Sequence, residues 1–530
     1  MRKFGKGGYP KVALVRGPVV SAEGALNNEA TPAIGLAYVA GTARSFGYAV
    51  EIIDAIAEGL DLVNGLDWCP GFVTLGLSPE ETVARVPADA DVIGVSGMFS
   101  GEWPVVRTII NALRARCPDA LIVAGGEHAT ALPEFVLRDC PALDLVVKGE
   151  GETTFLSVLD AYRQGEDMGA IGGICFLDGA GAFFDNGGLP RVRQLEKIPR
   201  PYWPDGYMEK FWEHGKSFGV QTARDMPMLA SRGCPYQCTF CSSPSMWTTR
   251  YILRDVDDLL EEINEYRRKY DITAIQFYDL TAITKKRWIL DFCQKLKSQN
   301  INLKWSLPSG TRSEALDHET LTLMRETNCN YLVYAPESGA PDTLKAIQKR
   351  ITLDEITASM RIAKEVGLIL RANLIIGFPG EGRREIYQTL CYGLRLAAMG
   401  IDEVPIFIYS AYPGSQLFRD LLAAGKVSLD DAYFFGLTAL NSKFNTLKPK
   451  TYNDAVPAVE LAIYRSVFML SNYLLGYLLF PSRILRTLRN LRGQEGAQAM
   501  TVLEHRIKDA KMRKRSSDAR NKSSVEKTAA

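Results

Sequence analysis

Two series of short apolar segments, each followed by a stretch with helical period, constrain the fold of this chain more than any other feature. The first series lies at residues 11–16, 49–55, 91–97, 120–126 and 143–149. The second lies at residues 227–233, 274–279, 303–309, 331–338, 371–380 and 403–414. Strand–helix alternation predicts parallel sheets with helices packed on their faces. We therefore expect an α/β protein with a five-stranded, doubly wound, flavodoxin-like domain and then a partial (β/α)6 barrel.

A chain of 530 residues is too long to fold around a single hydrophobic core, so several domains are expected. The predicted parts are the first α/β domain at 1–154, a connector at 155–225, the barrel at 226–424, a helical C-terminal region at 425–505 and a disordered basic tail at 506–530. The net charge of +1 gives no reason to expect a nucleic-acid partner. No apolar run of signal-peptide type follows the basic N-terminus, which predicts a cytoplasmic protein.

Glycine and small polar residues gather where strands of the first series end. They occupy residues 95–101, 124–130 and 148–154. Parallel sheets bind ligands at the carboxyl ends of their strands, and glycine lets a ligand approach the backbone closely. One such loop alone would be read as an ordinary turn. Three loops at the same edge of one sheet favour a ligand site.

Three cysteines, Cys234, Cys238 and Cys241, lie within eight residues, directly after the first strand of the second series. A structural zinc site needs a fourth ligand, and no further Cys or His lies near them. A [4Fe–4S] cluster bound by three cysteines leaves one iron free for a substrate or cofactor. We therefore expect an iron–sulfur cluster at the mouth of the barrel. The other seven cysteines are scattered, and we expect them to be free thiols.

The stretch "CPYQCTFC" resembles the signature of radical S-adenosylmethionine (SAM) enzymes. In that family the open iron binds SAM, and the reduced cluster cleaves it to a 5′-deoxyadenosyl radical. The later motifs "FYDL", "WSLPSGTR", "APESG" and "NLIIGFPGE" follow in the order of the family's SAM-binding strands. By this resemblance the SAM-binding residues are Phe240, Asp279, Ser306, Arg312, Glu337, Ile375 and Gly377.

The first α/β domain resembles the cobalamin-binding domain of the B12-dependent radical SAM class, through residues 31–54, "GGEHAT" and "GEGETT". The cobalamin-binding residues that this resemblance implies are Thr31, Gly35, Ser96, Met98, Gly125, Gly126, Glu127, His128, Gly149, Glu150 and Gly151. The Asp-x-His-x-x-Gly motif that gives cobalt a histidine ligand is absent. We therefore expect no histidine on cobalt, a lower face covered by the loop 98–103, and His128 at the corrin edge or tail.

The resemblance implies an enzyme whose cofactors are a [4Fe–4S] cluster, SAM and cobalamin. Its predicted reaction is methylation of an unactivated carbon through methylcobalamin. An alternative is a radical oxidation or cyclisation that resembles the anaerobic magnesium-protoporphyrin ester cyclase, and another is a cobalamin-binding sensor without catalysis. The expected partners are a small-molecule substrate and an electron donor such as flavodoxin or ferredoxin, with no nucleic acid. No catalytic side chain is assigned beyond the cofactor ligands.

The C-terminal region combines an apolar helix with a basic one. Residues 464–480 are the most apolar run, which we interpret as a buried helix because it is short for a membrane span. Four arginines then recur every third residue, at 483, 486, 489 and 492, beside leucines and an isoleucine. Such a helix either lies peripherally on an anionic membrane, at its inner face, or packs on its own domain. An apolar, lipid-like or tetrapyrrole-like substrate would suit this region.

Overall fold

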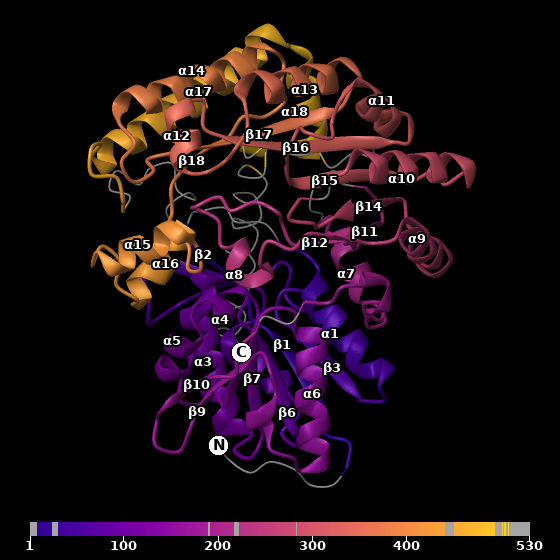
Figure 1. The fold of residues 1–530 in the computed structure, drawn as a ribbon, viewed down its shortest axis with the longest axis vertical. Helices are drawn as coiled ribbons and strands as arrows, with labels where there is room; N and C mark the ends of the chain where they lie inside the picture. The colour runs from indigo at the N-terminus through magenta and orange to yellow at the C-terminus, as the bar shows by residue number, and fades with distance from the viewer. Residues whose placement is uncertain are drawn as a thin grey trace, which may run out of the picture. The chain divides into compact units, whose positions relative to one another are not determined.

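The computed structural model describes residues 8–23, 30–188, 191–216, 222–281, 283–439 and 450–492, with residues 501, 503, 504 and 507. The predicted disordered tail therefore lies outside the described residues, apart from residue 507. The chain forms two compact units (Figure 1). The first contains Met1–Phe211, Phe240–Arg250 and Ala411–Ala439, and the second contains Trp212–Thr239, Tyr251–Ser410 and Leu440–Ala530.

The first unit is built on a seven-stranded sheet with the order β10-β9-β8-β7-β6-β1-β3. Its five parallel strands are β1 (Val12–Arg16), β3 (Val50–Asp54), β6 (Val92–Ser96), β7 (Leu121–Gly125) and β8 (Leu145–Val147). These are the five strands that the sequence predicts. The hairpin of β9 (Ile174–Leu177) and β10 (Phe183–Asp185) extends the sheet in antiparallel fashion. A small separate sheet joins β2 (Val19–Ala22), β5 (Phe72–Leu75) and β4 (Val63–Gly65).

Helices complete this doubly wound domain. They are α1 (Ile34–Ser45), α2 (Pro79–Arg85), α3 (Trp103–Arg116), α4 (Glu127–Ala131), α5 (Pro133–Asp139) and α6 (Gly151–Gln164). Helices α1 and α6 pack together, as do α2 and α3. The apolar core includes Val12, Leu14 and Val123 of the strands and Phe155 and Leu159 of α6. The sheet is thus held rigidly with its strand ends free to carry loops.

Segments from elsewhere in the chain join the first unit. Helix α8 (Ser243–Trp247) packs on α4, and α16 (Asp431–Ala439) packs on α3 and β2, next to α15 (Gln416–Ala423). Arg107 of α3 donates two hydrogen bonds to the Asp431 carboxylate at 2.8 and 2.9 Å. The Tyr433 hydroxyl donates to the Ala411 carbonyl at 2.5 Å. Residues 411–439 are therefore anchored by both polar and apolar contacts.

The second unit contains a six-stranded sheet with the order β11-β14-β15-β16-β17-β18. All neighbours are parallel, as the sequence predicts for a partial barrel. The strands are β11 (Asp225–Met228), β14 (Ala274–Phe277), β15 (Lys304–Thr311), β16 (Cys329–Glu337), β17 (Ile369–Ile376) and β18 (Ile406–Ile408). A short antiparallel pair, β12 (Ser231–Arg232) and β13 (Ile252–Leu253), follows β11.

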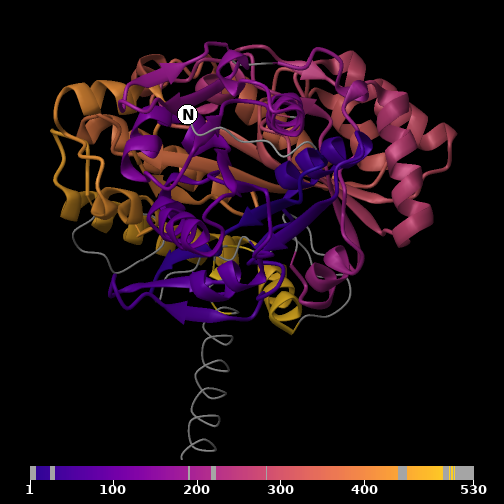
Figure 2. The ribbon, with the colours of Figure 1, turned by 90° about the horizontal axis from the view of Figure 1, so that it is seen from below.

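Helices alternate with these strands and cover one face of the sheet (Figures 1 and 2). They are α9 (Val256–Tyr270), α10 (Lys286–Ser298), α11 (His318–Glu326), α12 (Pro341–Ala346), α13 (Leu353–Glu365) and α14 (Arg383–Ala398). Side-chain caps fix several helix starts, for example Asp255, whose carboxylate accepts from the Asp257 and Asp258 amides. A last short helix, α7 (Tyr207–Glu213), lies where the chain passes between the units.

Two C-terminal helices, α17 (Ala458–Leu479) and α18 (Ser482–Arg492), complete the second unit. Helix α17 packs on α14 and β18 through residues such as Leu461, Phe468 and Met469. Its other face is open, since Leu470 is 65% exposed and Leu478 is 73% exposed. The predicted buried helix is therefore buried on one face only. None of the described helices combines the length and the apolar character needed to span a membrane.

Candidate cofactor sites

The three clustered cysteines lie in the loop that begins directly after β12. All three are half-buried, and none of them forms a disulfide. Burial raises the pKa of Cys238, while the nearby cations Lys349 and Arg312 act in the opposite direction. Within the described ranges, no group of three His, Cys, Asp or Glu side chains is arranged around a single metal ion. In a [4Fe–4S] cube each thiolate binds its own iron, so three cluster ligands need not converge on one point.

Asp279, the predicted contact of the SAM amino group, fastens the start of the cysteine loop. It lies two residues beyond β14 and is fully buried. One carboxylate oxygen accepts from the Ala230 amide at 3.0 Å, and the other accepts from the Ser231 hydroxyl at 2.5 Å. Burial raises the pKa of Asp279 to about 6, although these hydrogen bonds oppose the shift. The carboxylate therefore links the end of β14 to β12.

Arg312, Tyr236, Lys349 and Glu337 form a second support for the loop. The Arg312 guanidinium lies 3.5 Å from the ring centroid of Tyr236, which stands between the first two cysteines. It also donates to the Lys349 carbonyl at 2.8 Å and to the Arg350 carbonyl at 2.6 Å. The buried Lys349 ammonium contacts Glu337 at 2.9 Å. Sequence reasoning missed Lys349, because a lysine in a loop carries no local signal of burial.

The other predicted SAM contacts lie along the same sheet. Ser306 of β15 is buried and donates a hydrogen bond to the Gln276 side chain of β14. Ile375 lies on β17, and Gly377 follows that strand with a φ of +82°. The Gly377 amide donates to Glu381 at 2.6 Å, and burial raises the pKa of Glu381 to about 7. The structure thus places Ser306 on β15, and Ile375 and Gly377 on or directly after β17 of the same sheet, and their SAM contacts stay a prediction.

Phe240 and the residues after Cys241 belong to the first unit. Phe240 is half-buried. Ser242 donates a hydrogen bond to Glu127 of α4, and burial raises the pKa of Glu127. Glu127, predicted to contact cobalamin, is therefore occupied by a contact to the segment that follows the cysteine loop. Sequence reasoning could not pair residues 115 positions apart.

The loops after β6 and β7 meet backbone to backbone at the predicted cobalamin edge. The Gly97 amide donates to the Gly125 carbonyl at 2.7 Å. Gly126 has a φ of +107°, and a Cβ there would lie 2.9 Å from the Gly97 carbonyl carbon. Side chains of the loop point outward, since Met98 is 37% exposed and Phe99 is 56% exposed. Only glycine fits at position 126, and the loop after β6 is left open to a ligand.

His128 is packed inside the first unit. It is 1% exposed and lies between the rings of Trp103 and Phe434, whose centroids are 5.1 and 5.3 Å away. Its Nδ1 pairs with the Ser100 hydroxyl at 2.9 Å, and burial lowers its pKa to about 3. A contact between His128 and a corrin ring would require these aromatic rings to move. Burial thus keeps the imidazole neutral, and the absence of a histidine ligand on cobalt stays a prediction.

The remaining predicted cobalamin residues lie at the ends of β6 and β8 and around the start of α1. Buried Glu150 accepts from the Val192 amide at 2.6 Å and from Arg191 at 3.2 Å. Gly149, with a φ of +67°, donates to the Thr130 hydroxyl at 3.0 Å. The others, Thr31, Gly35, Ser96 and Gly151, are exposed or half-buried. They therefore line the edge where parallel strands end.

A polar network that the sequence did not predict fixes the segment before α1. Arg16, at the end of β1, donates to the Thr31 carbonyl at 2.6 Å and pairs with Asp54 of β3 at 3.4 Å. The Tyr207 hydroxyl donates to Asp54 at 2.6 Å and accepts from the Ala33 amide at 3.0 Å. Asp54, a charged residue at the end of the apolar strand β3, is the one feature of the sequence that points to this network. The network holds residues 31–33 over the carboxyl edge of the sheet.

The residues present fit the implied cofactors chemically. Three thiols without a neighbouring histidine suit an iron–sulfur cluster better than zinc. The buried cations Arg312 and Lys349 stand beside the loop that carries these thiols, where they offset anionic charge. The glycine-lined edge of the first sheet, with Met98 and Phe99 exposed, suits a large flat ligand.

This combination of a doubly wound domain and a cysteine-bearing partial barrel defines a cobalamin-dependent radical SAM enzyme. The family model "B12 binding domain" matches residues 28–159, and the model "Radical SAM superfamily" matches residues 228–391. The chain therefore belongs to the cobalamin-dependent radical SAM enzymes, and this membership confirms the predicted cofactors: cobalamin, SAM and a [4Fe–4S] cluster.

Several curated proteins match most of the chain. An uncharacterised methyltransferase of Pyrococcus horikoshii is 29% identical over 78% of this chain and 83% of its own length. The cytidylyl-2-hydroxyethylphosphonate methyltransferase of Streptomyces wedmorensis is 28% identical over 76% of this chain and 80% of its own. The anaerobic magnesium-protoporphyrin IX monomethyl ester cyclase of Rubrivivax gelatinosus is 25% identical over 83% of this chain and 74% of its own.

A solved structure agrees with the fold. The cobalamin-dependent SAM radical enzyme OxsB, with aqua-cobalamin and SAM bound, matches with a TM-score of 0.64. Its sequence is 16% identical, and the match covers 92% of this chain and 76% of that one. At this identity the likeness shows the fold alone, which is the predicted order of a B12-binding domain followed by a radical SAM domain.

Proposed function

We propose that this enzyme methylates an unactivated carbon of a small-molecule substrate. The observation that carries the proposal is the presence of both cofactor domains on one chain that aligns over most of its length with relatives named as methyltransferases. When bound, the cluster and SAM supply a 5′-deoxyadenosyl radical, and cobalamin supplies a carrier for the methyl group. The names of the relatives specify different substrates, so the substrate of this chain is not inherited from any of them.

The side chains of this protein would bind and position the reactants. We infer that Cys234, Cys238 and Cys241 are the cluster ligands. The cations Arg312 and Lys349 are within reach of the charges on the loop that carries them. The amide-lined loops after β6 and β7 would bind the corrin, with exposed Met98 and Phe99 against its face. A one-electron donor such as flavodoxin or ferredoxin would reduce the cluster.

A radical oxidation or cyclisation is the second candidate, because the Rubrivivax gelatinosus cyclase covers even more of this chain than the methyltransferases do. The test uses the anaerobically reconstituted full chain, a reductant, SAM with a deuterated methyl group and small-molecule extracts. A product that carries the labelled methyl group supports methylation. An unlabelled, oxidised product formed together with 5′-deoxyadenosine assigns the cyclase-like reaction. Cobalamin binding with no SAM cleavage would instead indicate a cobalamin-binding sensor without catalysis.

A further inference from the structure

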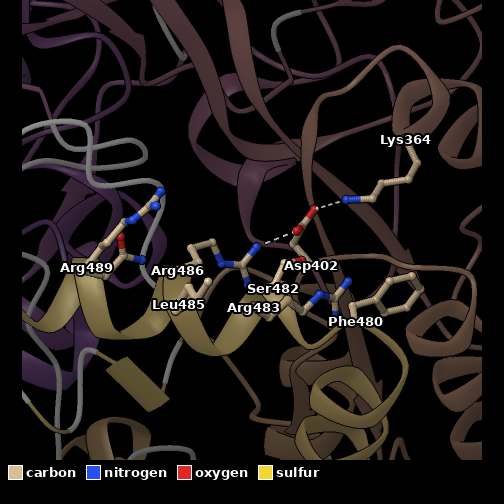
Figure 3. Close-up of a pocket in the computed structure, with 9 residues that line it drawn as sticks. Lys364, Asp402, Phe480, Ser482, Arg483, Leu485, Arg486 and Arg489 are labelled. Carbon is tan, nitrogen blue, oxygen red and sulfur yellow. Dashed lines mark hydrogen bonds and ion pairs between the residues drawn. The ribbon is translucent and has the colours of Figure 1, made fainter.

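A pocket at the start of α18 is lined by four cationic side chains and one carboxylate (Figure 3). The cavity has a volume of about 360 Å³. Its charged lining consists of Lys364 from the end of α13, Asp402 from the turn before β18, and Arg483, Arg486 and Arg489 from α18. All of these residues belong to the second unit. No part of the pocket is formed by the residues predicted to bind cofactors.

The single carboxylate does not neutralise the pocket. Asp402 Oδ1 pairs with Arg486 Nη1 at 2.5 Å, and Oδ2 pairs with Lys364 Nζ at 3.1 Å, as the dashed lines in Figure 3 show. Burial disfavours the charge on Asp402, but these two cations outweigh burial and lower its pKa. Among the described residues that line the pocket, one negative charge thus stands against four positive ones. Glu504 contacts Asn490 and Thr487 of α18, and the part of the chain that the structure describes shows no ion pair between Glu504 and these four cations.

Two of the arginines are held inside the protein, which agrees with the alternative in which this helix packs on its own domain. Arg483 donates to the Gly400 and Ile401 carbonyls at 2.7 and 3.0 Å, and burial lowers its pKa. Arg486 pairs with Asp402, yet its buried Nε has no hydrogen-bond partner among the described residues. A buried N–H without an acceptor, in a pocket with excess positive charge, indicates a site for an anionic oxygen.

Exposed apolar side chains lie on α17 and α18, and one of them lines the pocket. Leu485 lines it and is 59% exposed, and Leu488 is one turn further along α18 and 45% exposed. Leu478, in the last turn of α17, is also exposed. Monomeric soluble proteins seldom expose so many large apolar side chains together. A cationic pocket with an apolar rim is the pattern of a surface that meets both headgroups and acyl chains.

We propose that this pocket binds the phosphate group of an anionic lipid headgroup, with the exposed leucines of α17 and α18 against the acyl region. Arg486 Nε and the exposed Arg489 would donate to the phosphate oxygens, and guanidinium groups match phosphate well because they offer several fixed donors. A free phosphate would use the same cations but would leave the leucines without a role. The apolar rim therefore favours the lipid as the source of the phosphate.

Cosedimentation of the full-length protein with vesicles tests the proposal. The vesicles are equimolar phosphatidylcholine and phosphatidylglycerol, and pure phosphatidylcholine serves as the uncharged reference. Arg489→Gln should weaken binding to the anionic vesicles about fivefold, which corresponds to about 1 kcal/mol. Arg492→Gln is the matched control, because Arg492 is exposed on the same helix and does not line the pocket. This control should weaken binding clearly less.

A second variant separates the lipid from a free anion. Leu485→Gln should weaken vesicle binding, while inorganic phosphate binding, measured by calorimetry against chloride at equal ionic strength, stays unchanged. Arg489→Gln should weaken both. Both residues are exposed, so the variants are expected to melt like the wild type.

Three outcomes would overturn the proposal. Equal losses for Arg489→Gln and Arg492→Gln would indicate diffuse attraction without a pocket. Phosphate binding with no vesicle binding would assign the pocket to a free anion. Self-association of the protein that Leu485→Gln abolishes, without vesicle binding, would assign the apolar face to a second copy of the chain.

Discussion

Replacing Gly126 by alanine is the sharpest test of the predicted cobalamin edge. Gly126 has φ +107° and ψ −178°, a conformation that only glycine adopts readily, and forcing another residue into it costs about 1–3 kcal/mol. The new Cβ would also lie 2.9 Å from the Gly97 carbonyl carbon and oxygen and 3.0 Å from Met98 Cα. These are backbone atoms, so relief requires the loops after β6 and β7 to separate. We expect a total loss of about 3 kcal/mol.

Thermal unfolding and cobalamin binding measure the effect. A loss of this size should lower the melting temperature by about 6–12 °C, at roughly 2–4 °C per kcal/mol for a unit of this size. The control is Gly165→Ala, because Gly165 also has positive φ, +70°, but a Cβ there meets nothing within 4 Å. This control should lower the melting temperature by only about 2–4 °C. Gly126→Ala should also weaken hydroxocobalamin binding, and Gly165→Ala should not. Equal effects of the two variants on both measurements would refute the assignment of this edge to the ligand.

Further predictions concern the cysteine loop. Replacing its three cysteines with alanine should abolish iron binding and 5′-deoxyadenosine formation, while Cys391→Ala, which removes an exposed thiol elsewhere, should keep both. Burial raises the pKa of Asp279 to about 6, so the native state keeps a proton that the unfolded state loses near pH 4. The free energy of unfolding should therefore fall by up to about 3 kcal/mol as the pH rises from about 4 to about 6. In urea titrations at several pH values, Asp279→Asn should remove this part of the slope, and an unchanged slope would contradict the burial argument. Arg312→Lys should lower the iron content after reconstitution, because lysine cannot bridge the Lys349 and Arg350 carbonyls and stack on Tyr236 at once. Full iron content with weaker SAM binding would instead show that Arg312 contacts only SAM.

The strand series could be read from the sequence because buried parallel strands are continuous apolar runs. All eleven predicted strands form, five in the first sheet and six in the second. The pairing of β9 with β8 could not be predicted, because strand pairing depends on contacts between segments distant in sequence. The docking of α16 on α3 and β2 was hidden for the same reason.

Helical periodicity shows which side chains of a helix share a face, but it does not show which residues of other elements contact that face. The period of the four arginines on α18 predicted a stripe, and no acidic residue lies in the helix itself. The partner of Arg486 is Asp402, which is 84 residues earlier in the chain. Similarly, the apolar period of α17 could not show that Leu470 and Leu478 lack a covering element among the described residues. The structure was therefore required to show that Arg483 and Arg486 face the protein interior while Arg489 and Arg492 are exposed.

The cysteine spacing could be read because all three proposed cluster ligands lie in one local motif, whereas the supports of that motif come from separate strands. Asp279 follows β14, Arg312 follows β15, and Glu337 ends β16. In the structure Asp279 binds β12, and Arg312 contacts Tyr236 within the loop. Residues first assigned to SAM by resemblance thus also hold the backbone that carries the thiols. A three-cysteine loop must present its sulfurs in a fixed geometry to bind a cluster. Because the ends of the barrel strands hold this loop in place, the cluster site should form only when the barrel sheet is intact. Cluster binding and SAM binding should therefore respond together to changes at Asp279 and Arg312, and separately from changes at Gly126.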